Sequence, residues 1–180
     1  MIQAVGEDMT ETSWACSCCG GIHYGEPFSF AADYPDTFAN MSADQREARA
    51  IITSDQCIID QDQFYIRGCF EIPIRNTEQA FVYGAWVRVY EDAFDEIEDF
   101  WEIEGREKRI GPYKGRLVNE LKIYPETLNL RLEVRIQKVG ARPLFVSEDS
   151  HHRLTIDQLF GITRKQAEEY SCQLMRVIQR

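Results

Sequence analysis

The cysteines near the N-terminus have the spacing of a metal site. Cys16 and Cys19 stand three positions apart, Gly20 follows them directly, and His23 comes four positions after Cys19. Two thiolates at this spacing can bind one tetrahedral zinc ion, and the glycine permits a tight turn that aims backbone N–H groups at the sulfur atoms. The histidine is near enough to be a third ligand. We therefore predict a zinc site with Cys16, Cys19 and His23 among its ligands.

A fourth ligand has to come from a distant part of the chain. A structural zinc ion is usually bound by four side chains, and no second Cys-x-x-Cys pair is present. Cys57 and His152 are the leading candidates, and His151 is a further one. Cys69 suits this role less well, because it falls in the middle of a predicted strand.

Other interpretations of these cysteines stay open. A redox pair of the thioredoxin type expects a preceding strand and a following helix, whereas Gly20 and Pro27 indicate a loop. A catalytic zinc ion needs only three protein ligands and an open position for water, which Cys16, Cys19 and His23 could provide. In a third alternative these residues are free thiols without a function.

Two further groups of residues could also carry chemistry. Cys57 with His152 and an aspartate contains the ingredients of a thiol nucleophile, although a lone cysteine between apolar residues is more commonly a small core residue. Arg67 and Glu71 lie on the polar face of a predicted strand, where a guanidinium group can bind an anion. Ion pairs on a sheet surface are the commoner use of such residues. The sequence contains no G-x-G-x-x-G, P-loop, G-x-S-x-G or EF-hand motif, so we expect neither a common nucleotide enzyme nor a serine hydrolase.

Alternating apolar residues predict the strands that would position these groups. Apolar residues recur at every second position from Phe64 to Ile74, with an interruption at Gly68, and without interruption from Leu128 to Ile136. Phe81–Tyr90 is apolar on both faces, as in a central strand, and Leu144–Val146 can form a short edge strand. Because no regular crossover helices separate these strands, we predict an antiparallel sheet of about four or more strands.

Helix signals surround the predicted strands. A capping box predicts a helix over residues 43–52, and the acidic block 91–104 carries apolar residues on one side at helical spacing. Two further capping boxes, at Thr155 and Thr163, predict helices on either side of Gly161. The predicted fold class is therefore α+β, with helices flanking the sheet and a Cys/His knuckle at the N-terminus.

Length and composition favour a single domain. The chain has 180 residues, of which 44% are hydrophobic and 28% are charged, as is usual for one globular domain. We interpret residues 1–13 as a loose tail. Residues 14–180 form a single α+β domain in this interpretation, and residues 14–40 are its candidate zinc knuckle.

The charge distribution restricts the partners. The net charge is −10, residues 1–62 contain 11 acids and two arginines, and residues 91–104 contain eight acids and no base. This field repels phosphate backbones, so we predict no nucleic-acid binding, whereas a basic protein is a suitable partner. No apolar segment has the length of a membrane span, and the first residues do not form a signal peptide. We therefore predict a cytoplasmic protein without membrane association and with reduced cysteines.

A set of motifs along the chain is similar to a known pattern. The motifs are Cys16-x-x-Cys19-Gly20-x-x-His23, residues 54–60, Phe64–Gly68, Glu71–Ile74, Gly84–Val87, Tyr124-Pro125-x-Thr127, Arg142-Pro143 and His152-x-Leu154-x-x-x-Gln158-x-x-Gly161-Ile162. Over residues 14–165 the chain resembles a bacterial family of unknown function, numbered 2199. The chain departs from the family pattern at Arg153, where the pattern has proline, and at Arg116, near which the pattern has an aromatic residue. The resemblance implies a bacterial, cytoplasmic protein with one continuous domain, and it implies no activity.

Our leading hypothesis from the sequence is a non-enzymatic binding or regulatory domain with a structural zinc site. Its acidic segments would attract a basic protein partner. The alternative is a metal- or thiol-dependent enzyme that uses the Cys16, Cys19 and His23 cluster. The sequence indicates neither the ligand nor the oligomeric state.

Overall fold

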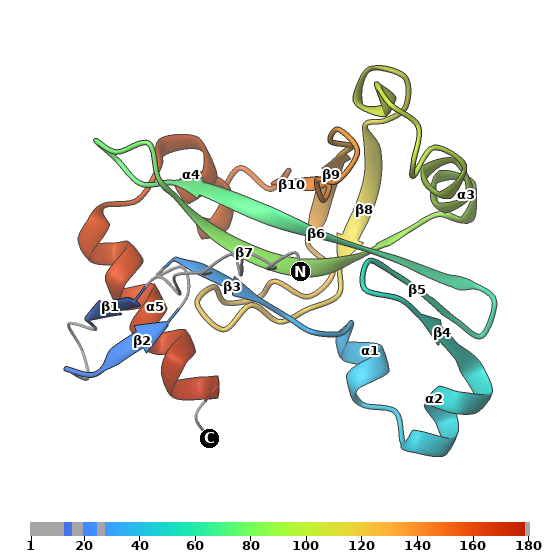
Figure 1. Ribbon diagram of the computed structural model, residues 1–180, viewed down its shortest axis with the longest axis horizontal. Helices are drawn as coiled ribbons and strands as arrows, with labels where there is room; N and C mark the ends of the chain where they lie inside the picture. The colour runs from blue at the N-terminus through green and yellow to red at the C-terminus, as the bar shows by residue number, and fades with distance from the viewer. Residues whose placement is uncertain (1–12, 16–19, 25–27, 179–180) are drawn as a thin grey trace, which may run out of the picture.

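The computed structural model describes residues 13–15, 20–24 and 28–178, and its main feature is an eight-stranded mixed sheet (Figure 1). The strands are β1 (Ser13–Ala15), β2 (Ile22–Tyr24), β3 (Ser29–Ala31), β4 (Ala50–Ile52), β5 (Gln56–Ile59), β6 (Gln63–Pro73), β7 (Ala80–Val89), β8 (Tyr113–Leu117), β9 (Arg131–Arg135) and β10 (Leu144–Ser147). The helices are α1 (Asp36–Ala39), α2 (Ala43–Arg49), α3 (Glu91–Asp99), α4 (Arg153–Phe160) and α5 (Arg164–Ile178), with a short 3₁₀ helix at Arg106–Lys108.

Five consecutive strands of the sheet, β6 to β10, close into a barrel. The order of the sheet is β3-β7-β8-β9-β10-β6-β5-β4, and an additional pairing of β7 with β6 completes the ring. In an up-and-down series of five strands the first and the last run in the same direction, so the closing pair has to be parallel. The β10–β6 pair is indeed parallel, at Leu144 and Cys69. The α+β class is confirmed, whereas the prediction of a purely antiparallel sheet is wrong.

Two glycines permit the close approach of the barrel strands. A Cβ atom on Gly68 of β6 would lie 2.5 Å from both the ring of Phe145 on β10 and the carbonyl oxygen of Pro143. A Cβ atom on Gly115 of β8 would lie 2.3 Å from a methyl group of Val87 on β7. Both glycines face the barrel interior, where there is no room for a larger residue.

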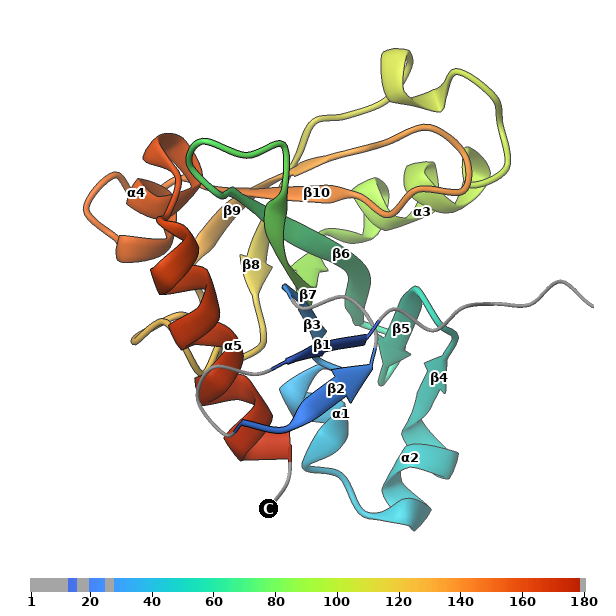
Figure 2. The ribbon, with the colours of Figure 1, turned by 60° about the vertical axis from the view of Figure 1, so that its left-hand side comes forward.

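The two faces of β6 and β7 belong to two separate cores. The residues that point into the barrel, such as Ile66 and Phe70, join the large core with the apolar sides of α3, α4 and α5. The opposite face carries Tyr65 and Trp86, which pack with Cys57 and the residues of α1 and β4. Helices α4 and α5 lie on one side of the barrel and α1, α2 and α3 on the other (Figures 1 and 2). The residues of β6 and β7 that neither core covers remain at the surface.

The predicted strands are confirmed in their centres and corrected at their ends. The strands predicted from Phe64 and Phe81 correspond to β6 and β7. The strand predicted over residues 128–136 is confined to β9, because Asn129 has a φ of 64° and ends the extended conformation. Leu144–Val146 is part of β10, an internal strand between β9 and β6. The helix predicted over residues 43–52 ends with α2, because Ala50–Ile52 pairs with β5 as β4.

Two of the three predicted capping boxes are confirmed. The Ser42 hydroxyl accepts from the N–H of Gln45 at the start of α2, and Thr163 and Gln166 bind each other in the same way before α5. The prediction for Thr155 is wrong, since it is buried inside α4 and donates to the Ser147 hydroxyl at 2.6 Å. The N-cap of α4 is His152 instead. Within the described residues, no helix is long and apolar enough to cross a membrane.

Candidate anion-binding site

Part of the predicted zinc cluster lies outside the described residues. Cys16 and Cys19 are in the connection between β1 and β2, which the structure does not describe, and His23 is placed by its backbone, directly opposite Trp14. In the segments that are described, no group of three or more His, Cys, Asp and Glu side chains is arranged to hold a metal ion. The zinc site at Cys16, Cys19 and His23 stays a prediction.

Cys57 is a buried residue of the smaller core. Its side chain has no exposed surface and packs with Tyr65 and Trp86. Burial raises the pKa of the Cys57 thiol to about 11, so the thiol is protonated at neutral pH and is a poor nucleophile. Among the described cysteines, Cys57 and Cys69 are free and Cys172 is disulfide-bonded. The expectation of reduced cysteines does not hold for Cys172.

His152 uses both ring nitrogens to fix the start of α4. Its Nδ1 accepts from the N–H of Leu154 at 3.1 Å, and its Nε2 lies 2.9 Å from the carbonyl oxygen of Pro125. This arrangement requires the proton on Nε2, which donates to the carbonyl. Strand β5, which carries Cys57, and helix α4 lie on opposite sides of the molecule in both views (Figures 1 and 2). Cys57 and His152 therefore belong to elements on opposite sides of the molecule, and neighbouring His151 is exposed. A zinc ligand from either residue stays a prediction.

Arg67 is engaged with backbone carbonyl groups. Its guanidinium group donates to the carbonyl oxygens of Ser54 at 3.3 Å and Ala32 at 3.1 Å. Next to it, Arg142 donates to the Asp55 carboxylate at 2.6 Å. Burial opposes ionisation of Asp55, but hydrogen bonds from Ser54 and Arg142 outweigh it and lower the pKa of this carboxyl group. Arg67 therefore joins separate loops, which fits the structural alternative better than an anion site.

A row of arginines crosses the outer face of three neighbouring strands. Arg88 on β7 lies directly opposite Arg116 on β8, and Arg116 lies directly opposite Arg131 on β9. All three side chains are exposed. Neighbouring strands are about 4.8 Å apart, so the row spans about 10 Å at the backbone.

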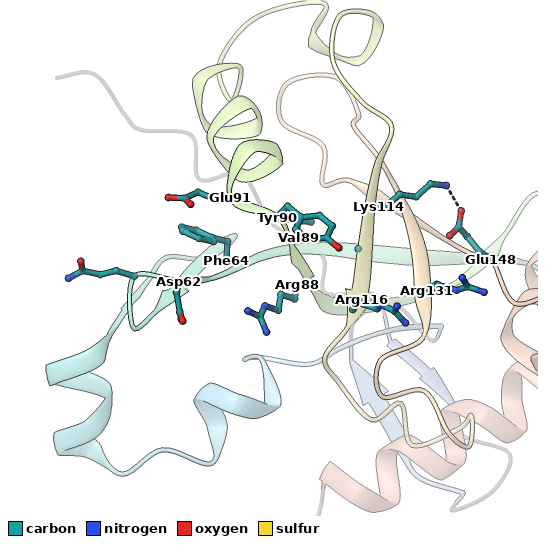
Figure 3. Close-up of a pocket in the computed structure, with 12 residues that line it drawn as sticks. Asp62, Phe64, Arg88, Val89, Tyr90, Glu91, Lys114, Arg116, Arg131 and Glu148 are labelled. Carbon is teal, nitrogen blue, oxygen red and sulfur yellow. Dashed lines mark hydrogen bonds and ion pairs between the residues drawn. The ribbon is translucent and has the colours of Figure 1, made fainter.

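The row borders a hollow of about 750 Å³, which forms where β7 and β8 separate (Figure 3). The two strands pair only at Val87 with Leu117 and Arg88 with Arg116. Beyond this point β7 turns into α3, and the gap exposes groups that the pairing would otherwise cover. Figure 3 shows Arg88, Arg116 and Arg131 in a row across the strands, with the Arg88 side chain pointing away from the other two and with Phe64 and Tyr90 on the other side of the strand ribbon.

The arginines of the row are only partly neutralised. Arg116 donates to the carbonyl oxygen of Asn129 at 3.0 Å, and the side chains of Arg88 and Arg131 have no hydrogen bond or ion pair with any described residue. Lys114 at the edge of the hollow is paired with Glu148. A hydrogen bond to Glu148 is the main cause that raises the pKa of Lys114. The Glu148 carboxylate therefore balances the positive charge of Lys114, whereas the positive charges of the arginine row are not balanced in this way.

The geometry of the hollow fits the binding of an anion. A guanidinium group presents up to five N–H donors in a fixed plane, and these match the oxygens of carboxylates and phosphates. The Arg88 and Arg131 donors are free to bind such a group, and most of those of Arg116 are free as well. The ring of Tyr90, which is 76% exposed, can at the same time cover an uncharged part of a ligand, whereas Phe64 and Val89 are core residues with little exposed surface.

Comparison with known proteins gives a family but no activity. A family model described as uncharacterised protein conserved in bacteria, DUF2199, matches residues 15–162. The chain belongs to this family. Searches of curated proteins and of solved structures found no match. Membership in the DUF2199 family confirms the resemblance stated from the sequence.

Several residues of the DUF2199 motifs stabilise the fold. The Thr127 hydroxyl accepts from the N–H of Leu121 at 2.8 Å, and the amide of Gln158 binds the backbone of β10 through Ser147 and Phe145. A Cβ atom on Gly161 would lie 2.8 Å from the carbonyl oxygen of Pro73. These contacts position loops and helices around the barrel, and of the residues that line the hollow only Phe64 belongs to these motifs.

The arginine row of the hollow does not stand out in the sequence. The short alternation of Tyr113, Gly115 and Leu117 with two cations was the only sign of β8, and Arg116 stands where the chain departs from the family pattern. Arg88 and Arg131 both lie in predicted strands, but nothing in the sequence indicates that Arg116 separates them. Strand order is what brings the three together.

Proposed function

We propose that this DUF2199 protein is a binding domain for an anionic ligand, which occupies the hollow beside Arg88, Arg116 and Arg131. The observation that carries the proposal is the placement of three arginines in register on adjacent strands, the outer two without an acidic partner among the described residues.

Like charges directly opposite each other destabilise a sheet, and favourable cross-strand pairs contribute about 0.2–1 kcal/mol each. The chain has 30 acids and 20 basic residues, so acidic residues are plentiful for neutralising such a row, as Glu133 does for Arg135 at 2.7 Å. A local arrangement that costs stability without a visible compensation is typical of a functional site. A bound anion would supply the missing compensation.

Binding is favoured over catalysis by the use of the described candidate groups. The thiol of Cys57 is buried with a raised pKa, and both ring nitrogens of His152 are engaged with backbone groups. Neither Cys57 nor His152 lines the hollow, so neither is placed to act as a nucleophile or general base on a ligand bound there.

The structural zinc site and the basic protein partner are retained as separate proposals. Zinc at Cys16, Cys19 and His23 is supported by their spacing in the sequence. A basic partner is supported by α3, whose exposed side carries Glu91, Asp92, Asp95, Glu96, Glu98 and Asp99. Association of this kind would weaken strongly as salt is added.

Titration with inorganic phosphate by calorimetry at low ionic strength tests the anion site. We expect saturable binding that is lost in the double variant Arg88→Gln, Arg131→Gln. The matched control is Arg135→Gln, a change of the same kind on the outer face of β9 outside the hollow. Equal binding by the wild type and the double variant would contradict the proposal.

A further inference from the structure

We infer that the ligand of the hollow is a compact phosphate monoester that carries a flat aromatic group, as a nucleoside monophosphate does. This inference rests on the proposed function, because it specifies the ligand of the same site.

The number and placement of the cations favour a phosphate over a carboxylate. A carboxylate carries one charge and two oxygens, which one guanidinium group can saturate through paired hydrogen bonds. A phosphate monoester carries almost two charges at neutral pH and has three terminal oxygens. Arg116 has a neighbour on each side in the row, and we place the dianion between Arg116 and one of these neighbours. Such a dianion relieves repulsion along the whole row.

An aromatic surface lies next to the cations. Tyr90 is 76% exposed and follows Arg88 by two positions, which corresponds to about 7 Å along an extended strand. Phe64 and Val89 line the hollow beside it. A flat group attached to the phosphate can therefore stack on Tyr90 while the phosphate stays at the arginines, because aromatic side chains bind any flat ring through its face.

The surroundings of the hollow favour a small ligand over a polymer. Asp62, Glu91 and Glu148 stand among the lining residues, and the acidic side of α3 begins at Glu91. A long polyanion such as single-stranded nucleic acid would have to pass these carboxylates and would be repelled by them. A monoester has a single charged group, which we place at the arginine row. The volume of about 750 Å³ is also in the range of small-molecule sites.

The test compares four probes by calorimetry at one ionic strength: adenosine 5′-monophosphate, inorganic phosphate, adenosine and a 5′-phosphorylated single-stranded oligonucleotide. We expect the monophosphate to bind roughly tenfold or more tightly than inorganic phosphate, since stacking of a base on an aromatic side chain contributes an effect of this order. Adenosine alone should bind more weakly than the monophosphate by at least a similar factor, and the oligonucleotide should bind more weakly as well.

Two variants separate the phosphate contact from the aromatic contact. Tyr90→Ala should reduce the affinity for the monophosphate towards that for inorganic phosphate, and should leave the affinity for inorganic phosphate unchanged. Arg131→Gln should weaken both, and Arg135→Gln should weaken neither. The unfolding midpoint of each variant checks that it is folded, and Tyr90 is a suitable choice because its side chain is mostly exposed.

The outcomes distinguish this inference from the proposed function. If inorganic phosphate binds as tightly as the monophosphate and Arg131→Gln weakens both, the anion site stands and the aromatic ligand class is wrong. If the oligonucleotide binds more tightly than the monophosphate, the restriction to small ligands is wrong. If no probe binds in a way that depends on the arginines, the proposed function fails together with this inference.

Discussion

Arg88 and Arg116 form the last residue pair between β7 and β8 before the two strands separate. Two like charges therefore lie opposite each other at the residue pair after which β7 and β8 separate. Phe64 and Val89 remain core residues at this point, and the exposed aromatic surface beside the arginines belongs to Tyr90. The combination provides cations and apolar surface within one small volume, which is what an amphiphilic anion requires.

Removing one charge from the row should stabilise the protein. Arg131→Gln removes one of the two arginines that lie opposite Arg116, and the Arg131 side chain has no hydrogen bond or ion pair with any described residue. We expect the free energy of unfolding to rise by about 0.2–1 kcal/mol at low ionic strength. Denaturant unfolding at low and high salt measures this, and the gain should shrink at high salt because mobile ions screen exposed charges.

The control for this experiment is Arg135→Gln on the same strand. Arg135 forms an ion pair with Glu133, so its removal should leave stability unchanged or slightly lower it. A loss of stability in Arg131→Gln that is the same at all salt concentrations would show that the arginine is a structural residue, and the repulsion argument would be wrong.

The elements of the fold that follow from local pattern were predictable, and those that follow from long-range pairing were not. The alternation that begins at Phe64 predicts β6, because one face of that strand packs on the barrel core. The edge position predicted for Leu144 was wrong, because a parallel bond to Cys69 closes the ring. No local signal indicates that closure, although Gly68 marks the place where β10 approaches.

The candidate site was even less predictable from local sequence pattern than the fold was. Arg88, Arg116 and Arg131 are 28 and 15 positions apart along the chain, and each by itself is an ordinary charged residue on the outer face of a strand. Only the order β7-β8-β9 turns them into neighbours. His152 shows the reverse case, since its motif suggested metal chemistry and the structure gives it a capping role.

Barrel closure should depend on the absence of a side chain at Gly68. Its φ is not in the left-handed region, so the effect of Gly68→Ala is steric: the new methyl group would overlap the ring of Phe145 and the carbonyl oxygen of Pro143. We expect a loss of about 1–3 kcal/mol of stability, as is usual for overpacking. Urea unfolding measures the change. Adding Phe145→Leu should recover part of it, and an unchanged midpoint in the single variant would contradict the steric argument.

The Cys57 thiol should be inert in the folded protein. It is fully buried, and burial raises its pKa from 9.0 to about 11. Alkylation at pH 8, followed by peptide mass spectrometry, should leave Cys57 unmodified until the protein is unfolded, because neither access nor the thiolate is available. Rapid native labelling of this cysteine would contradict the described burial and would favour the thiol-enzyme alternative.

The same pKa shift sets the pH at which Cys57 affects stability. Folding raises the pKa of the Cys57 thiol, so the protonated thiol contributes fully to the free energy of unfolding below its unfolded pKa of 9.0. This contribution is lost as the pH rises from 9.0 towards 11. Between these values the wild type should lose more stability than Cys57→Ala does. Parallel curves of unfolding free energy against pH for the wild type and Cys57→Ala would show that folding does not shift the pKa of Cys57.

The zinc content of variants distinguishes the predicted metal site from the capping role of His152. We expect about one zinc ion per chain in protein purified without added metal, lost in Cys16→Ser and Cys19→Ser together with stability, as for a structural site. His152→Leu should keep its zinc and lose about 1 kcal/mol of stability, because the Leu154 N–H loses its acceptor. His152→Asn retains a side-chain acceptor and should lose less. Loss of zinc from both His152 variants would make His152 the fourth ligand, and this would require an arrangement in which its ring nitrogens leave Leu154 and Pro125.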